Sequence, residues 1–252
     1  MNSQEFQFLT DILYKRSGLT LTEDKIYLIE SRLLPIARAQ GFADVPQLCN
    51  KLRTGASEDL LVEITEAMTT NESSFFRDIK PYEALRNIVF PMLKEKLAAQ
   101  KHIRIWSAAC STGQEPYTIA ICIQEDAAKM PGWTFEITGT DLAKKVVDKA
   151  MQGSYSQFEA QRGLPIQILL KYFVSQPDTS WQIKDTLKSM VKFKTFNLLD
   201  EYTSLGQFDI VFCRNVLIYF DEPIKAKITE KMARILPPHG ILVIGSTESL
   251  ID

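Results

Sequence analysis

The sequence predicts an α/β protein that has an all-helical N-terminal domain followed by a parallel sheet. Two observations lead to this prediction. The first 70 or so residues show apolar positions at helical spacing and no strand pattern, whereas short apolar strands alternate with helices from residue 103 onward. Strands that alternate with helices of this length are joined by right-handed crossovers, and such crossovers build a parallel sheet.

The N-terminal segment is expected to form four helices. The first ends at Gly18, and the second begins after an N-cap at Thr22 and runs to Gly41. Pro35 is expected to kink or split this second helix, because proline lacks the amide hydrogen that a helix interior needs. Ser57 provides an N-cap for the last helix. A module of this kind is typical of a cap or docking domain.

The second part of the chain is expected to contain five strands, over residues 103–109, 133–141, 190–198, 208–215 and 240–246. In a parallel α/β sheet, ligands bind beyond the carboxyl ends of the strands, near the point where the strand order reverses. We therefore expect the functional residues to follow the strands directly. The segments that do so are 107–115, Asp141, Asn197–Leu198 and Arg214–Tyr219.

Composition excludes several classes of protein. The net charge of −2 over 252 residues gives no basic field, so nucleic acid is not an expected partner. The chain start has no signal-peptide pattern, and no apolar run approaches the roughly 20 residues of a membrane span. We therefore expect a cytoplasmic protein without membrane insertion. The four cysteines are scattered and there are two histidines, so we expect neither a disulfide framework nor a metal site.

The loop after the first strand, SAACSTGQEP, differs from a dinucleotide-binding loop. It contains one glycine, Gly113, where a diphosphate would need several, and Glu115 lies at the helix start where a phosphate would be held. A carboxylate there favours an ammonium group, and Asp141 at the end of the second strand is placed for ribose hydroxyls. This pair suits S-adenosylmethionine. The alternative is a first-turn acid at Glu115 and an N-cap at Asp141, without a ligand.

Two further segments favour the ligand interpretation. TTNESSFFRD, residues 69–78, joins the two domains and combines polar groups with paired aromatics, which a plain linker seldom does. FCRNVLIYFD places Arg214, Asn215 and Tyr219 directly after the fourth strand, at the ligand-binding end of the sheet.

Five stretches of the chain resemble the CheR family, the chemotaxis receptor methyltransferases of bacteria. They are TTNESSFFRD, RIWSAACSTGQEPYTIAI, GTDL, FNLLD and FDIVFCRNVLIYFD, and the similarity runs from about residue 5 to residue 250. The resemblance implies an enzyme that methylates glutamate side chains on the cytoplasmic domains of chemoreceptors, using S-adenosyl-L-methionine and releasing S-adenosyl-L-homocysteine. It implies a helical domain over 1–75 and a Rossmann-like catalytic domain over 76–252, with a small β subdomain inserted at 155–190 between the second and third strands.

The resemblance also implies roles for individual residues. Cofactor-binding roles fall on Asn71, Ser73, Arg77, Glu115, Asp141, Asn197, Leu198, Arg214 and Asn215. Of these, Glu115 would hold the methionine amine, Asp141 the ribose, and Asn197–Leu198 would border the adenine. Arg77 and Tyr219 are the residues that the family links to methyl transfer. The alternative for Tyr219 is a half-buried aromatic that packs on the sheet.

The sequence departs from the family pattern in two places. The chain stops just after the fifth strand, whereas family members usually continue through two more strands. The turn of the inserted subdomain is built on Pro177-Asp178 and has no glycine, unlike members whose subdomain captures a C-terminal receptor peptide. We therefore expect an altered peptide-binding edge and methylation that does not depend on a C-terminal receptor tether.

Other functions remain open at this point. One alternative is an inactive scaffold that binds the cofactor and docks receptors or a regulatory adaptor protein. Another is a methyltransferase for small molecules or nucleic acid. The near-neutral charge and the lack of an Asn-Pro-Pro-Tyr motif count against nucleic acid. We expect a monomer whose partners are chemoreceptors and, as a candidate regulator, an adaptor protein.

Overall fold

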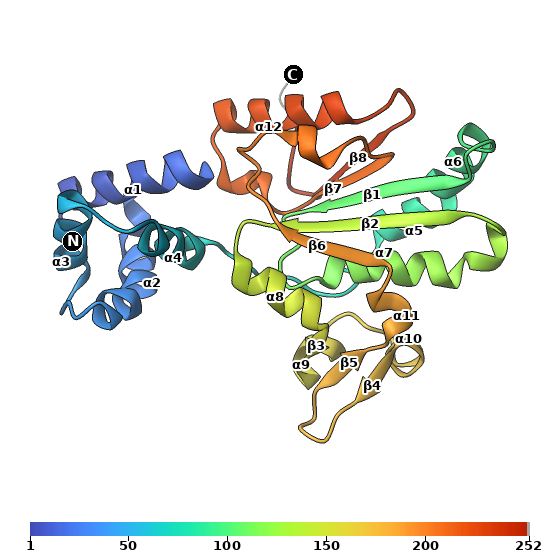
Figure 1. Cartoon of the computed structure of the whole chain (residues 1–252), viewed down its shortest axis with the longest axis horizontal. Coiled ribbons are helices and arrows are strands. Elements are labelled where there is room, and N and C mark those ends of the chain that lie inside the picture. The colour runs from blue at the N-terminus through green and yellow to red at the C-terminus, as the bar shows by residue number, and fades with distance from the viewer. Residues whose placement is uncertain (251–252) are drawn as a thin grey trace. The chain divides into compact units, whose positions relative to one another are not determined.

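The computed structural model describes residues 1–250, and the chain divides into two compact units (Figure 1). The first unit comprises residues 1–70 together with 218–226. The second comprises residues 71–217 and the chain from residue 227 onward. The segment 71–75, expected in the helical domain, therefore belongs to the sheet-containing unit, and 218–226, expected in the catalytic domain, groups with the helices.

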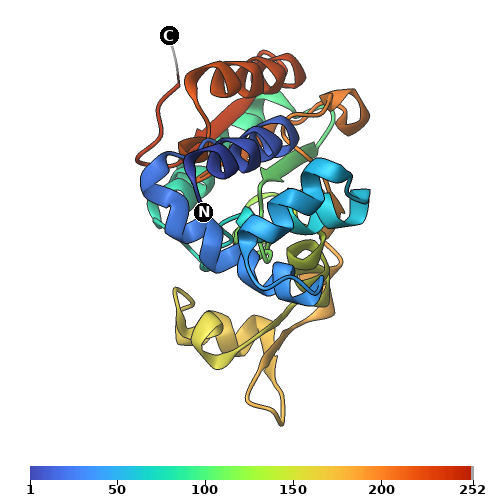
Figure 2. The ribbon, with the colours of Figure 1, turned by 90° about the vertical axis from the view of Figure 1, so that its left-hand side faces the viewer.

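The first unit contains the four expected helices, which Figure 2 shows from a second direction. They are α1 (Ser3–Ser17), α2 (Ile26–Ala39), α3 (Val45–Thr54) and α4 (Glu58–Met68), with a short 3-10 helix, η1 (Glu23–Lys25), before α2. Gly18 ends α1 at a φ of 75°, a left-handed conformation that glycine adopts without strain. Ser57 caps α4 by accepting a hydrogen bond from Leu60 N. Pro35 lies inside α2 and does not split it.

One buried apolar cluster holds these helices together. Leu9, Leu13, Ile29, Leu48 and Ile64 are all fully buried within it. The returning segment 218–226 joins this unit through backbone contacts, because Leu19 and Phe220 form an isolated antiparallel bridge. The Tyr14 hydroxyl also donates a hydrogen bond to the Asp221 carboxylate, at 3.0 Å.

The second unit is built on a five-stranded parallel sheet, as predicted (Figure 1). Its strands are β1 (His102–Ala108), β2 (Thr134–Asp141), β6 (Val191–Thr195), β7 (Ile210–Cys213) and β8 (Ile241–Ile244), in the order β6-β2-β1-β7-β8. The chain builds outward from β1 in one direction and then reverses, so the switch point lies between β1 and β7. Their carboxyl ends are level, because Ala108 pairs with Cys213.

Helices cover this sheet. They are α5 (Lys80–Ala84), the π-helical η2 (Leu85–Val89), α6 (Phe90–Lys96), α7 (Gln114–Glu125), α8 (Lys144–Gln152) and α12 (Glu222–Ile235). Helix α7 packs against β1, β2 and β6, while α8 packs against β2 and β6. The central strands are apolar and buried on both faces, which is typical of parallel sheets. The helices over 80–96 were not predicted, although Pro81 stands at a favourable first-turn position.

The inserted subdomain is present between β2 and β6. It contains a three-stranded sheet, β3 (Ser154–Tyr155), β4 (Phe173–Ser175) and β5 (Trp181–Ile183), in the order β3-β5-β4, with helices α9 (Gln157–Gln161), α10 (Ile166–Tyr172) and α11 (Asp185–Lys188). The β4–β5 turn is stabilised by Asp178, whose Oδ1 accepts hydrogen bonds from Ser180 N and Oγ. Thr179 takes the left-handed conformation in this turn, at a φ of 66°.

Candidate functional site

Left-handed backbone conformations gather around the switch point. Five residues other than glycine have a φ between 50° and 59° there: Phe76, Asp78, Ala109, Ser111 and Asn215. They belong to the segment that precedes α5 and to the loops that follow β1 and β7. Such conformations cost energy in residues with a side chain, and they concentrate at functional sites. The strand ends at the switch point therefore form the candidate functional site.

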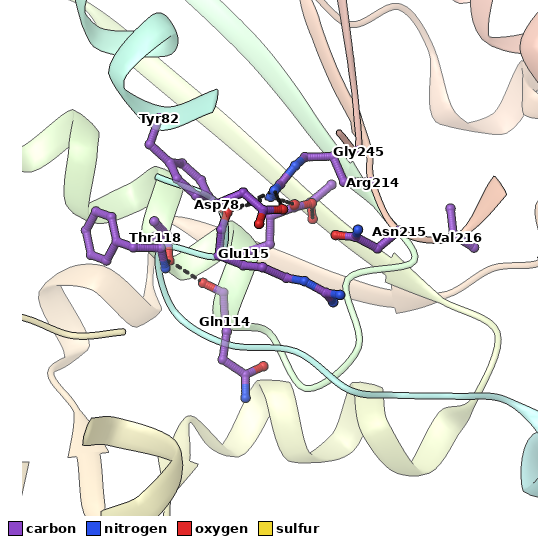
Figure 3. Close-up of polar contacts among 12 residues, drawn as sticks. Asp78, Tyr82, Gln114, Glu115, Thr118, Arg214, Asn215, Val216 and Gly245 are labelled. Atoms are coloured by element: carbon purple, nitrogen blue, oxygen red, sulfur yellow. Dashed lines mark hydrogen bonds and ion pairs between the residues drawn. The ribbon is translucent and has the colours of Figure 1, made fainter. Parts of the chain in front are cut away.

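Arg214, the residue after β7, lies at the centre of a buried polar network (Figure 3). Its side chain is 1% exposed. Nη1 donates hydrogen bonds to Glu115 Oε2 at 3.0 Å and to the Tyr82 hydroxyl at 3.2 Å. Nη2 donates to Asp78 Oδ2 at 2.9 Å and to the carbonyl oxygen of Arg77 at 2.8 Å. Arg214 thus connects the loop after β7 with α7 and with the segment before α5.

Glu115 is the acidic partner of this arginine and retains access to solvent. Its side chain is 12% exposed, and Ser107 Oγ donates a hydrogen bond to its Oε1 at 2.8 Å. Burial raises the pKa of Glu115, while the nearby Arg214 charge and the Ser107 hydroxyl oppose that rise. For Arg214, burial acts to lower the pKa, but the Glu115 carboxylate outweighs it and the pKa is raised. Arg214 is therefore positively charged at physiological pH, and its charge favours the ionised form of the Glu115 carboxylate.

The surroundings of Glu115 fit a ligand that carries an ammonium group. A carboxylate has about four lone-pair sites, and Ser107 and Arg214 each use one. The remaining sites are free to accept hydrogen bonds from a bound cation. Among residues 1–250, Arg214 Nε is a buried side-chain nitrogen without a hydrogen-bond partner, so the network also retains an unused donor. A phosphate at this position would meet the Glu115 charge directly.

Asp141 joins the loops that follow β1 and β2. Its side chain is buried, Oδ2 accepts a hydrogen bond from Ser111 N at 2.8 Å, and Oδ1 accepts one from Ala143 N at 3.1 Å. The second bond resembles the capping role that the sequence left open. The first fixes the β1 loop, and Ser111 Oγ in turn donates to the carbonyl oxygen of Asn71 at 2.7 Å. Asp141 therefore shapes the site through backbone contacts as well as contributing a carboxylate to it.

The other predicted residues of the second unit follow the same strand ends. Asn197 follows β6, and its Oδ1 accepts a hydrogen bond from Leu199 N, while Leu198 is buried. Ser73 and Arg77 are half-buried in the segment before α5. The guanidinium of Arg77 donates a hydrogen bond to the carbonyl oxygen of Glu72, at 3.0 Å.

Tyr219 belongs to a different part of the structure. It is half-buried at the end of the 3-10 helix η5 (Leu217–Tyr219), and it groups with the first unit. Its carbonyl oxygen accepts a hydrogen bond from Thr20 N, at 3.0 Å. In sequence it follows Arg214 by five residues.

The inserted subdomain contacts both the linker segment and the β1 loop. The Tyr155 hydroxyl donates a hydrogen bond to the carbonyl oxygen of Thr112, at 2.8 Å, and the Tyr155 ring meets that of Phe75 edge-on at a centroid distance of 4.9 Å. Gly163 packs so closely on Phe75 that an added Cβ would collide with the Phe75 carbonyl oxygen. The subdomain therefore supports the two segments from which several of the predicted site residues come.

Sequence reasoning missed several of these residues. Asp78 lies inside the quoted linker motif, and its acidic side chain beside Arg77 was a usable signal. Tyr82 lies in the unpredicted helix α5, where nothing in the local pattern marks it. Glu248 accepts hydrogen bonds from the backbone N–H groups of 215–217, and its place shortly after β8 was a usable signal.

Two domains of one family match nearly the whole chain. The all-alpha domain of the CheR methyltransferases matches residues 4–69, and their SAM binding domain matches residues 71–252. The chain belongs to the CheR methyltransferase family. It is accordingly an S-adenosylmethionine-dependent methyltransferase of chemotaxis adaptation, and the family membership gives no support to an inactive scaffold.

Curated members of the family are similar over almost their full length. The chain is 39% identical over 249 residues to the chemotaxis protein methyltransferase Cher2 of Pseudomonas putida, covering 98% of this chain and 90% of the relative. It is 38% identical over 252 residues to chemotaxis protein methyltransferase 1 of Vibrio cholerae, covering 99% and 90%. Solved structures match more distantly: PKMT2 from Rickettsia typhi is 18% identical with a TM-score of 0.36, covering 56% of this chain and 20% of that one.

The remaining expectations concern membrane insertion, partners, oligomeric state and location. Within residues 1–250, the structure contains no helix with both the length and the hydropathy of a membrane span. The receptor partners, the adaptor, the monomeric state and the cytoplasmic location remain predictions.

Proposed function

We propose that this methyltransferase esterifies glutamate side chains on the cytoplasmic domains of chemoreceptors. The observation that carries the proposal is the contact of Glu115 with Arg214 at the switch point of a CheR-family sheet, which favours an amino-acid-bearing nucleoside over a phosphate. The named relatives are chemotaxis protein methyltransferases that match this chain over nearly its whole length, which supports a receptor substrate.

The reaction needs no strong base. Bound S-adenosylmethionine supplies a sulfonium methyl group, which passes to a carboxylate oxygen and leaves a methyl ester and S-adenosylhomocysteine. A glutamate carboxylate is already ionised at pH 7, so no proton has to be removed before it reacts. The protein therefore has to bind the reactants, align them and exclude water.

We assign the binding roles to the residues at the strand ends. Glu115, held by Ser107 and Arg214, accepts hydrogen bonds from the methionine ammonium, and Asp141 accepts them from ribose hydroxyls. Arg214 acts through Glu115 rather than on the reacting atoms, because its side chain is 1% exposed and its two Nη atoms bond to protein groups. Asn197–Leu198 border the adenine.

The remaining roles concern the carboxylates. Arg77 is half-buried and contributes a guanidinium for the methionine carboxylate, since arginine binds a carboxylate through two parallel hydrogen bonds. Asn71 and Ser73 approach the cofactor from the same segment, and Asn215 completes the site from the loop after β7. Tyr219 orients the incoming glutamate through its hydroxyl.

The test is methyl transfer to a receptor fragment. Receptor cytoplasmic domain is incubated with methyl-labelled S-adenosylmethionine, and mass spectrometry locates the label. We expect label on glutamate side chains, released as methanol by mild base, as methyl esters are. Label that resists base, or a receptor left unmodified by a protein that binds the cofactor, would overturn the proposal.

The variant Tyr219→Phe tests the role of the Tyr219 hydroxyl, because it keeps the ring and removes only the hydroxyl group. Turnover should fall by about ten- to a hundred-fold, the order of one lost charge-assisted hydrogen bond, while cofactor binding stays intact. An unaltered rate would return Tyr219 to a packing role.

A further inference from the structure

A single carboxylate holds the backbone of the loop that follows β7. Glu248 Oε1 accepts hydrogen bonds from Val216 N at 2.8 Å and Leu217 N at 2.7 Å. Glu248 Oε2 accepts them from Asn215 N at 2.8 Å and Gly245 N at 2.6 Å. Three of the four donors are consecutive residues, and Figure 3 shows Asn215 and Val216 following Arg214 along the chain.

The local backbone is arranged around this carboxylate. Asn215 takes the left-handed conformation at a φ of 58°, which turns its amide and the next two amides toward one point. Gly245 leaves room for the acid, because a Cβ at that position would lie 2.5 Å from Glu248 Oε2. A concave set of amides of this kind is an anion-binding arrangement, and here the anion comes from the chain itself.

The held segment leads directly to groups with proposed roles in the reaction. Asn215 is its first residue, and Tyr219 follows Leu217 by two residues within η5. One of the bound amides, that of Leu217, belongs to the first residue of η5, where a short helix has unsatisfied N–H groups. Without the carboxylate, the left-handed turn at Asn215 would lose the interactions that offset its strain.

We propose that Glu248 is a positioning residue for methyl transfer, which fixes the loop 215–217, the segment that continues into η5 and Tyr219. This inference rests on the proposed function. Glu248 does not touch the reacting atoms; its role is to hold the backbone on which the acceptor-orienting hydroxyl depends. Its loss should therefore lower turnover more than it lowers cofactor affinity, since Asn215 is the one residue of 215–217 with a proposed cofactor-binding role, whereas Glu115 and Asp141 lie on other loops.

The experiment compares Glu248→Gln with Glu248→Asp and with Glu230→Gln. Glutamine keeps the size of the side chain but replaces one acceptor oxygen by an amide group, which faces two N–H donors. Aspartate keeps the charge and shortens the reach. Glu230→Gln removes a charge from α12 at a side chain that is 63% exposed, so it controls for net charge alone.

Three measurements are made on each variant. They are kcat for receptor methylation per cofactor-binding site, the Kd for S-adenosylhomocysteine by calorimetry, and amide hydrogen exchange of the peptide over 214–219. For Glu248→Gln we expect a ten- to a hundred-fold lower kcat, a Kd within about threefold of the wild type, and faster exchange over 214–219. Glu248→Asp should be intermediate, and the Glu230 variant unchanged.

The outcomes separate the two proposals. A folded Glu248→Gln protein with wild-type exchange over 214–219, or with wild-type kcat per binding site, overturns the positioning role. Equal losses in kcat and in cofactor affinity also overturn it, since they indicate general damage to the fold. If Glu248→Gln does not fold, the same criteria apply to Glu248→Asp. A wild-type protein that methylates no receptor refutes the proposed function instead, and hydrogen exchange still decides whether Glu248 holds the loop.

Discussion

Glu115→Gln is the sharpest single test of how this protein recognises its cofactor. The substitution keeps the shape of the side chain and an oxygen for the Ser107 hydroxyl, and removes the negative charge that faces Arg214. If Glu115 accepts hydrogen bonds from the methionine ammonium, the variant loses the ionic part of that interaction. Glutamine also has an NH2 group in place of one carboxylate oxygen, and that group donates hydrogen bonds instead of accepting them.

The size of the effect follows from the chemistry of the contact. A hydrogen bond between charged groups contributes about 1.5–3 kcal/mol. Since 1.4 kcal/mol corresponds to a tenfold change in affinity, S-adenosylhomocysteine should bind about 10- to 150-fold more weakly. The matched control is Glu125→Gln at the other end of α7, where the carboxylate bonds to Lys171 and Tyr172 instead. The control should bind normally.

Calorimetry at several pH values adds an independent measurement. Burial raises the pKa of Glu115, so its protonation begins at a higher pH than for an ordinary glutamate. Because the protonated acid binds an ammonium poorly, wild-type affinity should fall as the pH is lowered toward that raised pKa. The Glu115→Gln protein should not show this loss of affinity at low pH, because glutamine does not titrate. Wild-type affinity in a folded variant, or an identical pH profile in the two proteins, would refute the assignment.

Three further predictions concern stability, the cofactor loop and the receptor. Arg86 holds the pKa of Asp126 at about 2 through hydrogen bonds to both carboxylate oxygens, so Asp126→Asn should lose about 2 kcal/mol of unfolding free energy at pH 7 in urea titrations. The wild-type advantage is present above the ordinary aspartate pKa and should disappear as the pH falls from about 4 to about 2. Tyr155→Phe removes one hydrogen bond to the Thr112 carbonyl and should weaken S-adenosylhomocysteine binding about two- to tenfold by calorimetry, whereas Tyr172→Phe in the same subdomain should not. A receptor without its C-terminal tail should be methylated about as fast as the intact receptor, and tight binding of the isolated tail peptide would contradict this.

Much of the fold was predictable because its signals are local. Strands β7 and β8 are short apolar runs, β6 alternates apolar and polar residues, and the α1 and α4 boundaries follow from Gly18 and Ser57. Pro35 was a misleading signal in part, because α2 continues through it. The helices over 80–96 had no comparable pattern of caps, and the π-helical turn inside them interrupts the 3.6-residue period on which such a prediction depends.

The sequence was enough to predict many of the residues of the candidate site, but not which contacts these residues make with one another. Strand ends identified Glu115 and Arg214 separately, but their ion pair joins residues 99 positions apart, which no local pattern encodes. The capping bond of Asp141 was foreseen as an alternative to ligand binding, and its bond to Ser111 N was not. Likewise, the grouping of 218–226 with the helical unit depends on pairings such as Leu19 with Phe220, which only the folded chain reveals.

The contacts of the inserted subdomain limit how this enzyme can be re-engineered. Grafting an inserted subdomain from a relative is a direct way to attempt a change of receptor preference. Here Tyr155 anchors the Thr112 carbonyl, and Gly163 leaves space for the Phe75 backbone. A chimera made by swapping 155–190 wholesale would replace both, so the exchange would alter the catalytic domain along with the specificity. Grafts should therefore keep residues 155–163 native, together with Lys171 and Tyr172, which bond to Glu125 of α7, and Phe173, whose ring meets that of Phe75.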